Sequence, residues 1–403
     1  MRMQILDGNC FIHIGEAGFS KDWSAGGVPT GGIYHLMCQV LTAFRNSEDC
    51  RVVFDSPSFR KEMLDGYKAN RKSNSKIITQ IQAIKPLLQE MGVQVYQVPG
   101  YEGDDLIANI IRHCVWSQSD VYGARDAEVK GIPYFKEKPK EDVLADVYSA
   151  DYDLLMNVSN KTVFRGANSN VATVDMENFN TIVRNIKTFN TDVPYNTIGL
   201  FKVCFGDKSD CYSGVGEEAH KLWGYLKFLY ERDYVSVGEA RPVDKDLALL
   251  MLTTLQTLVK PETYQRALEN VEIVYPRYLT PEELKANGID FNIRSPLGDE
   301  RDVARRKKFA NAFAKTCRIF RLKSLYRKIT GGADLPEATE QEKQYLKHIK
   351  QSYDLDYFAY QDGIDPNNEV EYNGSKEIME MKKLTGNTTW DSAIAGGNVG
   401  LDD

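Results

Sequence analysis

Four apolar segments in the first 150 residues predict the strands of one central sheet. They cover Met3–Asp7, Arg51–Asp55, Val93–Val98 and Val143–Ala150. Short apolar runs of this kind are typical of buried parallel strands. Apolar residues at helical spacing lie between them, over Gly32–Phe44, over Ile77–Met91 and from Leu106 onward. This alternation predicts an α/β fold with a central, mostly parallel sheet flanked by helices.

The second half of the chain is mainly helical in pattern. A hairpin is expected from Lys161–Phe164 and Asn170–Val174, and polar residues 119–142 read as an inserted loop. Helical spacing follows over Tyr195–Phe205, Glu217–Tyr230, residues 244–268 and the basic stretch Arg305–Lys328. We therefore expect an α/β core over residues 1–200, a helical extension over 201–330 and a tail over 331–403. From Asp354 onward the tail has eleven acidic and three basic residues, a composition typical of a flexible segment.

Carboxylates follow the predicted strands with unusual regularity. In an open α/β sheet, ligands gather where the strands end. An acidic residue in a first helical turn also caps free N–H groups, so capping is an open alternative for one or two of them. Three carboxylates within four positions, as at 102–105, repel each other unless a cation or solvent offsets them. The candidates are Asp7, Asp55, Glu102, Asp104, Asp105, Asp151 and Asp153, with Asp207 and Asp210 in a glycine-flanked turn.

An oxygen-only ligand set of this kind indicates a hard cation, Mg²⁺ or Mn²⁺, rather than zinc. The seven cysteines are scattered and form no CxxC pair, and the chain has only five histidines. One Mg²⁺ usually takes one or two carboxylates, so the set favours two ions. Two ions that activate a water and stabilise a leaving oxygen are typical of a hydrolytic nuclease.

A basic segment separates the second predicted strand from the next helix. Between residues 56 and 76 it carries six lysines and arginines, interleaved with Phe59 and Tyr67. It is either a solvated surface loop or a flexible basic gate beside the carboxylates, with Tyr67 available to stack on a base. In the second case Arg60, Lys68 and Arg71 are placed to clamp a phosphate.

Composition and charge restrict the possible partners and location of the protein but do not identify a function. The net charge of −7 neither indicates nor excludes a nucleic-acid partner, because phosphate contacts depend on local basic patches. No apolar run approaches the ~18 residues of a membrane helix, so no membrane partner is expected. The N-terminus lacks the apolar core of a secretory signal, and the scattered cysteines suit a reducing cytoplasm.

The order of these motifs resembles the 5′-nuclease (flap endonuclease) family, which includes the 5′–3′ exonuclease domain of DNA polymerase I and stand-alone phage 5′–3′ exonucleases and ribonuclease H. The resemblance covers residues 1–230 and extends weakly to 328. Tyr67-Lys68-Ala69-Asn70-Arg71 is its most specific piece. The others are Ile5–Gly8, Val53–Asp55 with Ser58–Arg60, Val98–Asp105, Ala150–Leu154, and Gly206–Asp210 with Ser213–Val215.

The resemblance implies roles for individual residues. Asp7, Asp55, Glu102, Asp104 and Asp105 would hold one Mg²⁺, and Asp151, Asp153, Asp207 and Asp210 would complete the second site, partly through waters. Lys68 and Arg60 would contact the scissile phosphate. Residues 56–76 would form a basic arch around a single-stranded 5′ end, in which Tyr67 stacks on a base and Arg71 binds phosphate, with Lys72 beside it.

The sequence departs from the family pattern in four places. Gly103 stands where the family usually has alanine, and Cys10–His13 replaces a stretch that often carries an arginine. The glycine-rich helical hairpin that grips duplex DNA is shortened to Gly216–Lys221, and its two glutamates would repel phosphate. The insertion at 119–142 is longer than expected. Gripping of duplex DNA by the hairpin is therefore in question.

The main functional hypothesis is a monomeric, Mg²⁺-dependent 5′-nuclease that acts on DNA 5′ flaps, 5′ ends or RNA–DNA hybrids and removes RNA primers. A stand-alone nuclease of this type favours a phage origin, with action in the bacterial cytoplasm. A non-catalytic DNA-junction binder of the same fold is the main alternative, and a small ribonuclease with an acidic site is a third. The tail is either a docking segment for replication proteins or a solubilising segment that packs back on the core.

Overall fold

The computed structural model describes residues 2–18, 23–47, 49–69, 74–115, 143–168, 171–186, 189, 193–194, 197–235, 242–289, 291 and 299–353. Three predictions lie outside these residues: the insertion at 119–142, the roles of Arg71 and Lys72, and the tail beyond Tyr353. No helix within the described ranges is long and apolar enough to cross a membrane.

The centre of the molecule is a five-stranded parallel sheet, which confirms the predicted fold class. Its strand order is β5-β4-β1-β6-β7, and all four pairings are parallel. Since β1 lies in the middle, the carboxyl ends of β1, β4 and β6 open on the same edge. The strands are β1 (Arg2–Asp7), β4 (Cys50–Val53), β5 (Gln94–Tyr96), β6 (Leu144–Ser149) and β7 (Thr162–Gly166).

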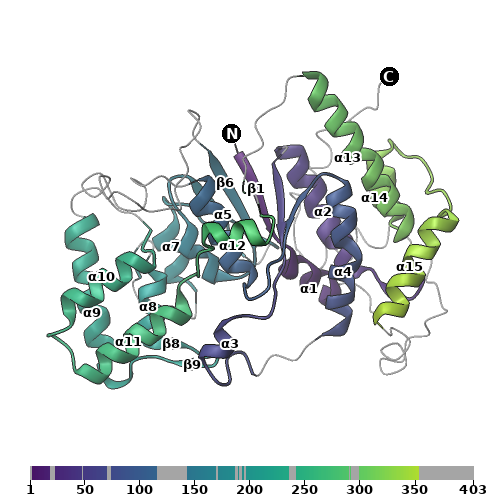
Figure 1. Ribbon diagram of the computed structural model, residues 1–403. Helices are drawn as coiled ribbons and strands as arrows, with labels where there is room; N and C mark the ends of the chain where they lie inside the picture. The colour runs from purple at the N-terminus through teal and green to yellow at the C-terminus, as the bar shows by residue number, and fades with distance from the viewer. Residues whose placement is uncertain are drawn as a thin grey trace.

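Each face of the sheet is covered by its own group of helices (Figure 1). Met3 and Ile5 of β1 point into one apolar core and Leu6 into the other, because successive residues of a strand face opposite sides. The Leu6 core is completed by α1 (Gly8–Gly18), α2 (Gly31–Asn46), α4 (Ser75–Glu90), α13 (Asp299–Ile319), α14 (Lys323–Ile329) and α15 (Glu340–Tyr353). The Met3 core is completed by α5 (Gly103–Cys114), α8 (Ile198–Phe205), α9 (Ala219–Tyr230), α10 (Lys245–Leu255) and α11 (Pro261–Val274).

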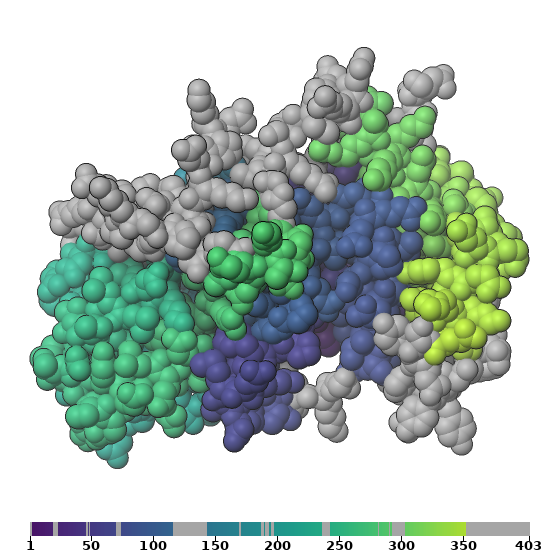
Figure 2. Space-filling model, in the orientation of Figure 1, coloured from purple at the N-terminus to yellow at the C-terminus, as the bar shows by residue number. Residues whose placement is uncertain are grey.

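Short elements connect these layers. The segment that contains α3 (Arg60–Met63) projects at the lower edge of the face in Figure 2, beside the helices of residues 200–275. Two of the short elements are the paired strands β8 (Gly206–Asp207) and β9 (Tyr212–Ser213). The remainder are β2 (Ser24–Ala25), β3 (Val28–Pro29), η1 (Tyr152–Asn157), α7 (Phe179–Arg184), η2 (Gly216–Glu218), η3 (Glu231–Val235) and α12 (Pro281–Ala286).

The structure differs from the predicted elements in three places. Among the described residues, the hairpin after Lys161 is reduced to β7 and one antiparallel bridge between Phe164 and Val174, and β7 pairs in parallel with β6 along its other edge. The helix expected over 244–268 is two helices, since Pro261 starts α11 and cannot continue α10. No helix is predicted over Pro281–Ala286, where the structure has α12.

The start of the predicted tail packs on the core. In α15, Leu346 and Ile349 are buried, and the Tyr345 hydroxyl donates to the carbonyl of Ala83 on α4. Within the predicted extension, α8–α11 and α13–α14 lie on opposite faces of the sheet (Figure 1). The domain boundaries at 200 and 330 stay predictions.

Candidate active site

A cavity of about 990 Å³ opens at the carboxyl ends of β1, β4 and β6. Its walls come from the strand ends, the first turn of α5, η1, α8 and the β8–β9 turn. The carboxylates in its lining are Asp7, Asp55, Glu102, Asp104, Asp151, Asp153 and Asp207. The fold thus brings seven of the nine predicted metal ligands to one cavity, and Asp105 and Asp210 lie directly beside them.

The strand-end carboxylates are held by short local hydrogen bonds. Asp7 accepts from the Cys10 amide at 3.0 Å and from the Ser149 hydroxyl at 2.7 Å. Asp55 accepts from the Gly103 amide at 2.6 Å, which links β4 to the start of α5. Removal from bulk water and the nearby charge of Asp7 raise the pKa of Asp55 to about 7. A carboxylate with so high a pKa gains from a cation in the cavity.

The first carboxylate cluster consists of Glu102, Asp104 and Asp105 at the N-terminus of α5. One carboxylate oxygen from each residue lies within 4.8 Å of the others. Asp105 accepts from the Glu102 amide at 3.1 Å, and Asp104 accepts from the Asp105 amide at 2.8 Å. Capping of α5 therefore uses Asp105, in a capping box with Glu102, while metal binding by this motif stays a prediction.

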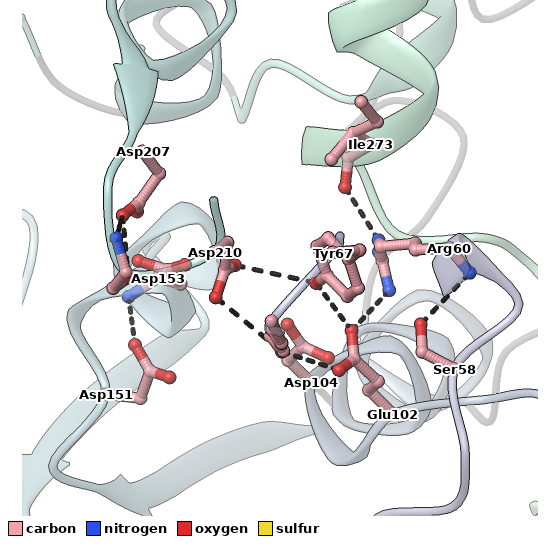
Figure 3. Close-up of polar contacts among 12 residues, drawn as sticks. Ser58, Arg60, Tyr67, Glu102, Asp104, Asp151, Asp153, Asp207, Asp210 and Ile273 are labelled. Carbon is pink, nitrogen blue, oxygen red and sulfur yellow. Dashed lines mark hydrogen bonds and ion pairs between the residues drawn. The ribbon is translucent and has the colours of Figure 1, made fainter. Parts of the chain in front are cut away.

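Arg60 is buried behind this cluster. Its guanidinium donates to both oxygens of Asp105, at 2.7 and 2.8 Å. It also donates to Glu102 at 2.8 Å (Figure 3). Its Nε donates to the carbonyl of Ile273 at 2.6 Å. Arg60 is 2% exposed and is absent from the cavity lining. The expected contact with a scissile phosphate would require these bonds to break.

Lys68 and Tyr67 reach the same cluster from the basic segment. The Lys68 ammonium lines the cavity, donates to Glu102 at 2.5 Å and lies 3.9 Å from Asp210. Its backbone has a φ of +52°, a left-handed conformation that costs energy for a lysine. The Tyr67 hydroxyl donates to Glu102 at 2.9 Å, and the side chain is buried. The Lys68 site is thus preformed, while stacking of the Tyr67 ring on a base stays a prediction.

The second carboxylate cluster consists of Asp153, Asp207 and Asp210, again with oxygens within 4.8 Å of one another. Asp207 and Asp210 flank the tight β8–β9 turn, and Asp207 accepts from the amide and hydroxyl of Ser209 at 2.7 and 2.6 Å. Asp151 borders this cluster and accepts from the Asp153 amide at 3.0 Å. Burial and the charge of Asp153 raise the pKa of Asp151 to about 8.

Sequence reasoning missed Lys202, a lysine on α8 whose ammonium donates to Asp153 and Asp207. The signal was present in the sequence, because Lys202 is the one charged residue within the apolar helix Ile198–Phe205 and precedes Asp207 by five positions. Charged side chains of this kind are buried only with partners.

The structure also shows where two of the departures from the family pattern lie. Cys10 and His13 line the cavity from α1. In the shortened hairpin, Glu218 accepts from the Lys260 amide and the Thr263 hydroxyl, both at 2.9 Å, and so caps α11. The negative charge of Glu218 is therefore stabilised by hydrogen-bond donors within the protein.

The donor chemistry of both clusters fits a hard divalent cation. Every ligand atom in them is a carboxylate oxygen, which is the ligand type that Mg²⁺ and Mn²⁺ prefer. Burial, and after it the charge of a neighbouring carboxylate, raises the pKa of Asp55 and of Asp151, and a cation in the cavity would offset both effects. The site is thus an acidic, cation-accepting cavity on a parallel α/β sheet.

Comparisons with known proteins agree with this class. Residues 2–123 match the family model of the 5′-3′ exonuclease N-terminal resolvase-like domain. The chain is 29% identical to a 5′-3′ exonuclease of Aquifex aeolicus over 219 residues, 53% of this chain and 64% of that protein. It is 26% identical to a 5′-3′ exonuclease of Bacillus subtilis over 212 residues, 49% of this chain and 59% of that protein.

The chain spans between 39 and 64% of the length of the curated relatives it first matches. A solved structure of T5 5′-exonuclease with bound zinc aligns with 88% of this chain and all of its own, at 13% identity and a TM-score of 0.41. The sequence matches confirm the resemblance to the 5′-nuclease family, and the family-model match falls on residues 2–123.

Proposed function

We propose that this protein is a Mg²⁺-dependent 5′-nuclease that hydrolyses phosphodiester bonds at DNA 5′ ends and 5′ flaps. The observation that carries the proposal is the convergence of seven carboxylates on one cavity, with the Lys68 ammonium in its wall. A junction binder would gain nothing from so much negative charge at the place where phosphates arrive. The names of the matched relatives, 5′-3′ exonucleases, point the same way.

The residues present divide the chemistry between them. Asp7, Asp55, Glu102 and Asp104 would hold one Mg²⁺, and Asp151, Asp153, Asp207 and Asp210 a second, and together these ions supply an activated water and stabilise the leaving oxygen. Lys68 places a positive charge beside the first cluster, where charge develops on the phosphate. Arg60 and Asp105 hold the start of α5, and with it Glu102 and Asp104, in position.

The test is gel-resolved cleavage of a 5′-labelled flap duplex, with Mg²⁺ and with a chelator. We expect Mg²⁺-dependent release of short 5′ products that is lost in Asp104→Asn. Asp104 suits this test better than Asp105, because removal of the Asp105 charge would break the buried pair with Arg60 and leave Glu102 to balance that guanidinium. Glu269→Gln is the matched control, since it neutralises an exposed carboxylate on α11 and should leave cleavage unchanged.

Other outcomes would favour the alternatives. Tight binding of the flap without cleavage in Mg²⁺ or Mn²⁺ would support the junction binder. Cleavage of single-stranded RNA in preference to the flap would support the ribonuclease. Cleavage of an RNA–DNA hybrid at its RNA 5′ end would support a role in removing RNA primers during replication. Phage origin, cytoplasmic location and monomeric state also stay proposals.

The tail stays a proposed docking segment for replication proteins, and the structure changes how this is tested. Truncation after Gly332 would remove α15 and the buried Leu346 and Ile349. Truncation after Tyr353 keeps them. Unchanged flap cleavage by the latter variant, with unchanged stimulation by replication partners, would contradict the docking role.

A further inference from the structure

The second carboxylate cluster already contains a cation of the protein's own. The Lys202 ammonium lies between Asp153 and Asp207 and donates to a carboxylate oxygen of each, at 2.5 Å in the case of Asp207. In Figure 3 these two carboxylates lie close together on the left of the site, with Asp210 between them and the first cluster. The ammonium occupies oxygens that are also the candidate ligands of a metal ion.

The fold holds this ammonium in place. Lys202 extends from α8, whose other side chains are apolar, and its own side chain is 5% exposed. Lys202 lines the cavity together with Asp153 and Asp207, so its ammonium lies where a cation would meet these two carboxylates. Because a buried charge without a partner is costly, Lys202 stays with the carboxylates unless another cation compensates both sides.

The first cluster is different. The Lys68 ammonium donates to Glu102 and acts on Asp104 through its charge, and Asp104 lines the open cavity with Asp7 and Asp55. A cation can thus approach Asp104, Asp7 and Asp55 without displacing an ammonium. In the second cluster a divalent ion and the ammonium would compete for the same oxygens, and like charges at such close range repel each other.

We propose that Lys202 is a tethered cation that lowers the affinity of the second carboxylate cluster for a divalent metal ion, so that the two clusters fill in order, the first before the second. Lys202 is in this sense a positioning residue that controls metal occupancy. The proposal rests on the proposed function, because it assumes that the cavity binds divalent metal.

The experiment is a titration of the full-length protein with Mn²⁺ in the absence of nucleic acid, with free Mn²⁺ followed by electron paramagnetic resonance. We expect one tight ion and one weak ion in the wild-type protein. In Lys202→Met, which keeps the length of the side chain and removes its charge, the weak ion should bind at least about tenfold more tightly, or ~1.4 kcal/mol. Lys202→Arg should restore the wild-type pattern.

Two further variants make the result specific. Lys208→Met removes a positive charge from an exposed lysine in the wall of the same cavity and should leave both affinities within about twofold. If Lys202→Met fails to fold, Lys202→Gln provides the neutral side chain with a remaining donor. Thermal unfolding with and without Mn²⁺ checks that each variant is folded.

The outcomes separate the two proposals. Two ions of equal affinity in the wild-type protein, or unchanged binding in both neutral Lys202 variants, would overturn the role of Lys202 and leave the proposed function intact. Absence of any Mn²⁺ binding to the wild-type protein would overturn the proposed function, and the role of Lys202 with it.

Discussion

The guanidinium of Arg60 and the carboxylate of Asp105 form a buried, two-pronged ion pair. The paired atoms are Nη2 with Oδ1 at 2.7 Å and Nη1 with Oδ2 at 2.8 Å, and both side chains are almost fully excluded from solvent. Arg60 also donates to the carbonyl of Ile273, so the pair connects α3, the start of α5 and the end of α11. Two residues that the motifs assign to catalysis and metal binding are thus joined at the point where three elements meet.

This pair predicts strong and coupled effects on stability. Arg60→Met or Asp105→Asn alone should lower the free energy of unfolding by ~3–5 kcal/mol, because each breaks a buried, doubly hydrogen-bonded ion pair and leaves the other charge in the interior without this partner. The double variant should lose less than the sum by at least ~1 kcal/mol. Urea unfolding of the four proteins measures the coupling. Strictly additive losses would show that the two side chains do not depend on each other.

The exposed pair Arg266–Glu269 on α11 is the matched comparison. Its charged atoms are 3.1 Å apart, but both side chains are about half exposed. Removing either partner should change stability by no more than ~0.5 kcal/mol, because solvent screens the pair.

A second prediction concerns the β8–β9 turn, whose backbone sets the geometry of the second cluster. Gly206 has a φ of +75°, and a Cβ added there would lie 2.4 Å from the amide nitrogen of Gly214. Gly206→Ala should therefore cost more than ~1 kcal/mol and weaken Mn²⁺ binding through the displaced Asp207. Gly224→Ala in the exposed part of α9 meets no atom within 4 Å and should instead stabilise by ~0.5–1 kcal/mol. Equal effects of the two changes on unfolding would contradict this account.

The sequence was sufficient to predict the sheet and the gathering of carboxylates at one of its edges. Apolar runs that end in Asp7 and Asp55 imply parallel strands with carboxylates on one edge, and a parallel sheet places those ends together whatever the details of packing. Hard-cation chemistry followed from the residue types alone. These features depend on local pattern and on one general rule of topology.

What the sequence did not yield depends on contacts between distant segments. Arg60 meets the carbonyl of Ile273 from 213 positions away, and no local pattern signals that it turns inward. Lys202 joins Asp153 across 49 positions, and only its place in an apolar helix marked it. The sequence did not reveal α15, because its region is mostly polar and only a narrow apolar stripe of the helix packs on α4.

The pKa of Asp55 leads to a prediction of how pH changes the stability of the metal-free protein. Its pKa is raised to about 7 in the folded state, so between pH ~4 and 7 the folded protein holds a proton that the unfolded chain has lost. The free energy of unfolding in chelator should therefore fall as pH rises through this window. Asp55→Asn should flatten the decline, and Mg²⁺ should stabilise the wild-type protein more at pH 8 than at pH 5. Urea unfolding at several pH values tests this, and an unchanged slope in Asp55→Asn would contradict it.

Lys68 gives the prediction that bears most directly on catalysis. Its ammonium is held beside Glu102 at 2.5 Å and over the ring of Tyr67 at 5.0 Å, on a backbone with a φ of +52°. Maintaining a left-handed lysine at the cavity is costly, and the cost is consistent with a charge preorganised for the transition state. Lys68→Met should lower kcat on a flap duplex by ~10²–10³ while the Kd for the duplex changes much less.

The comparison is Lys61→Met, which removes an exposed lysine of α3 from the same basic segment. This change should affect only the salt dependence of binding, because an exposed charge outside the cavity lining steers the substrate without stabilising the transition state. Single-turnover cleavage and fluorescence anisotropy separate kcat from Kd. If Lys68→Met weakened binding as much as it slowed cleavage, Lys68 would be a substrate-steering residue like Lys61. A fall in kcat alone would place its charge at the reacting phosphate.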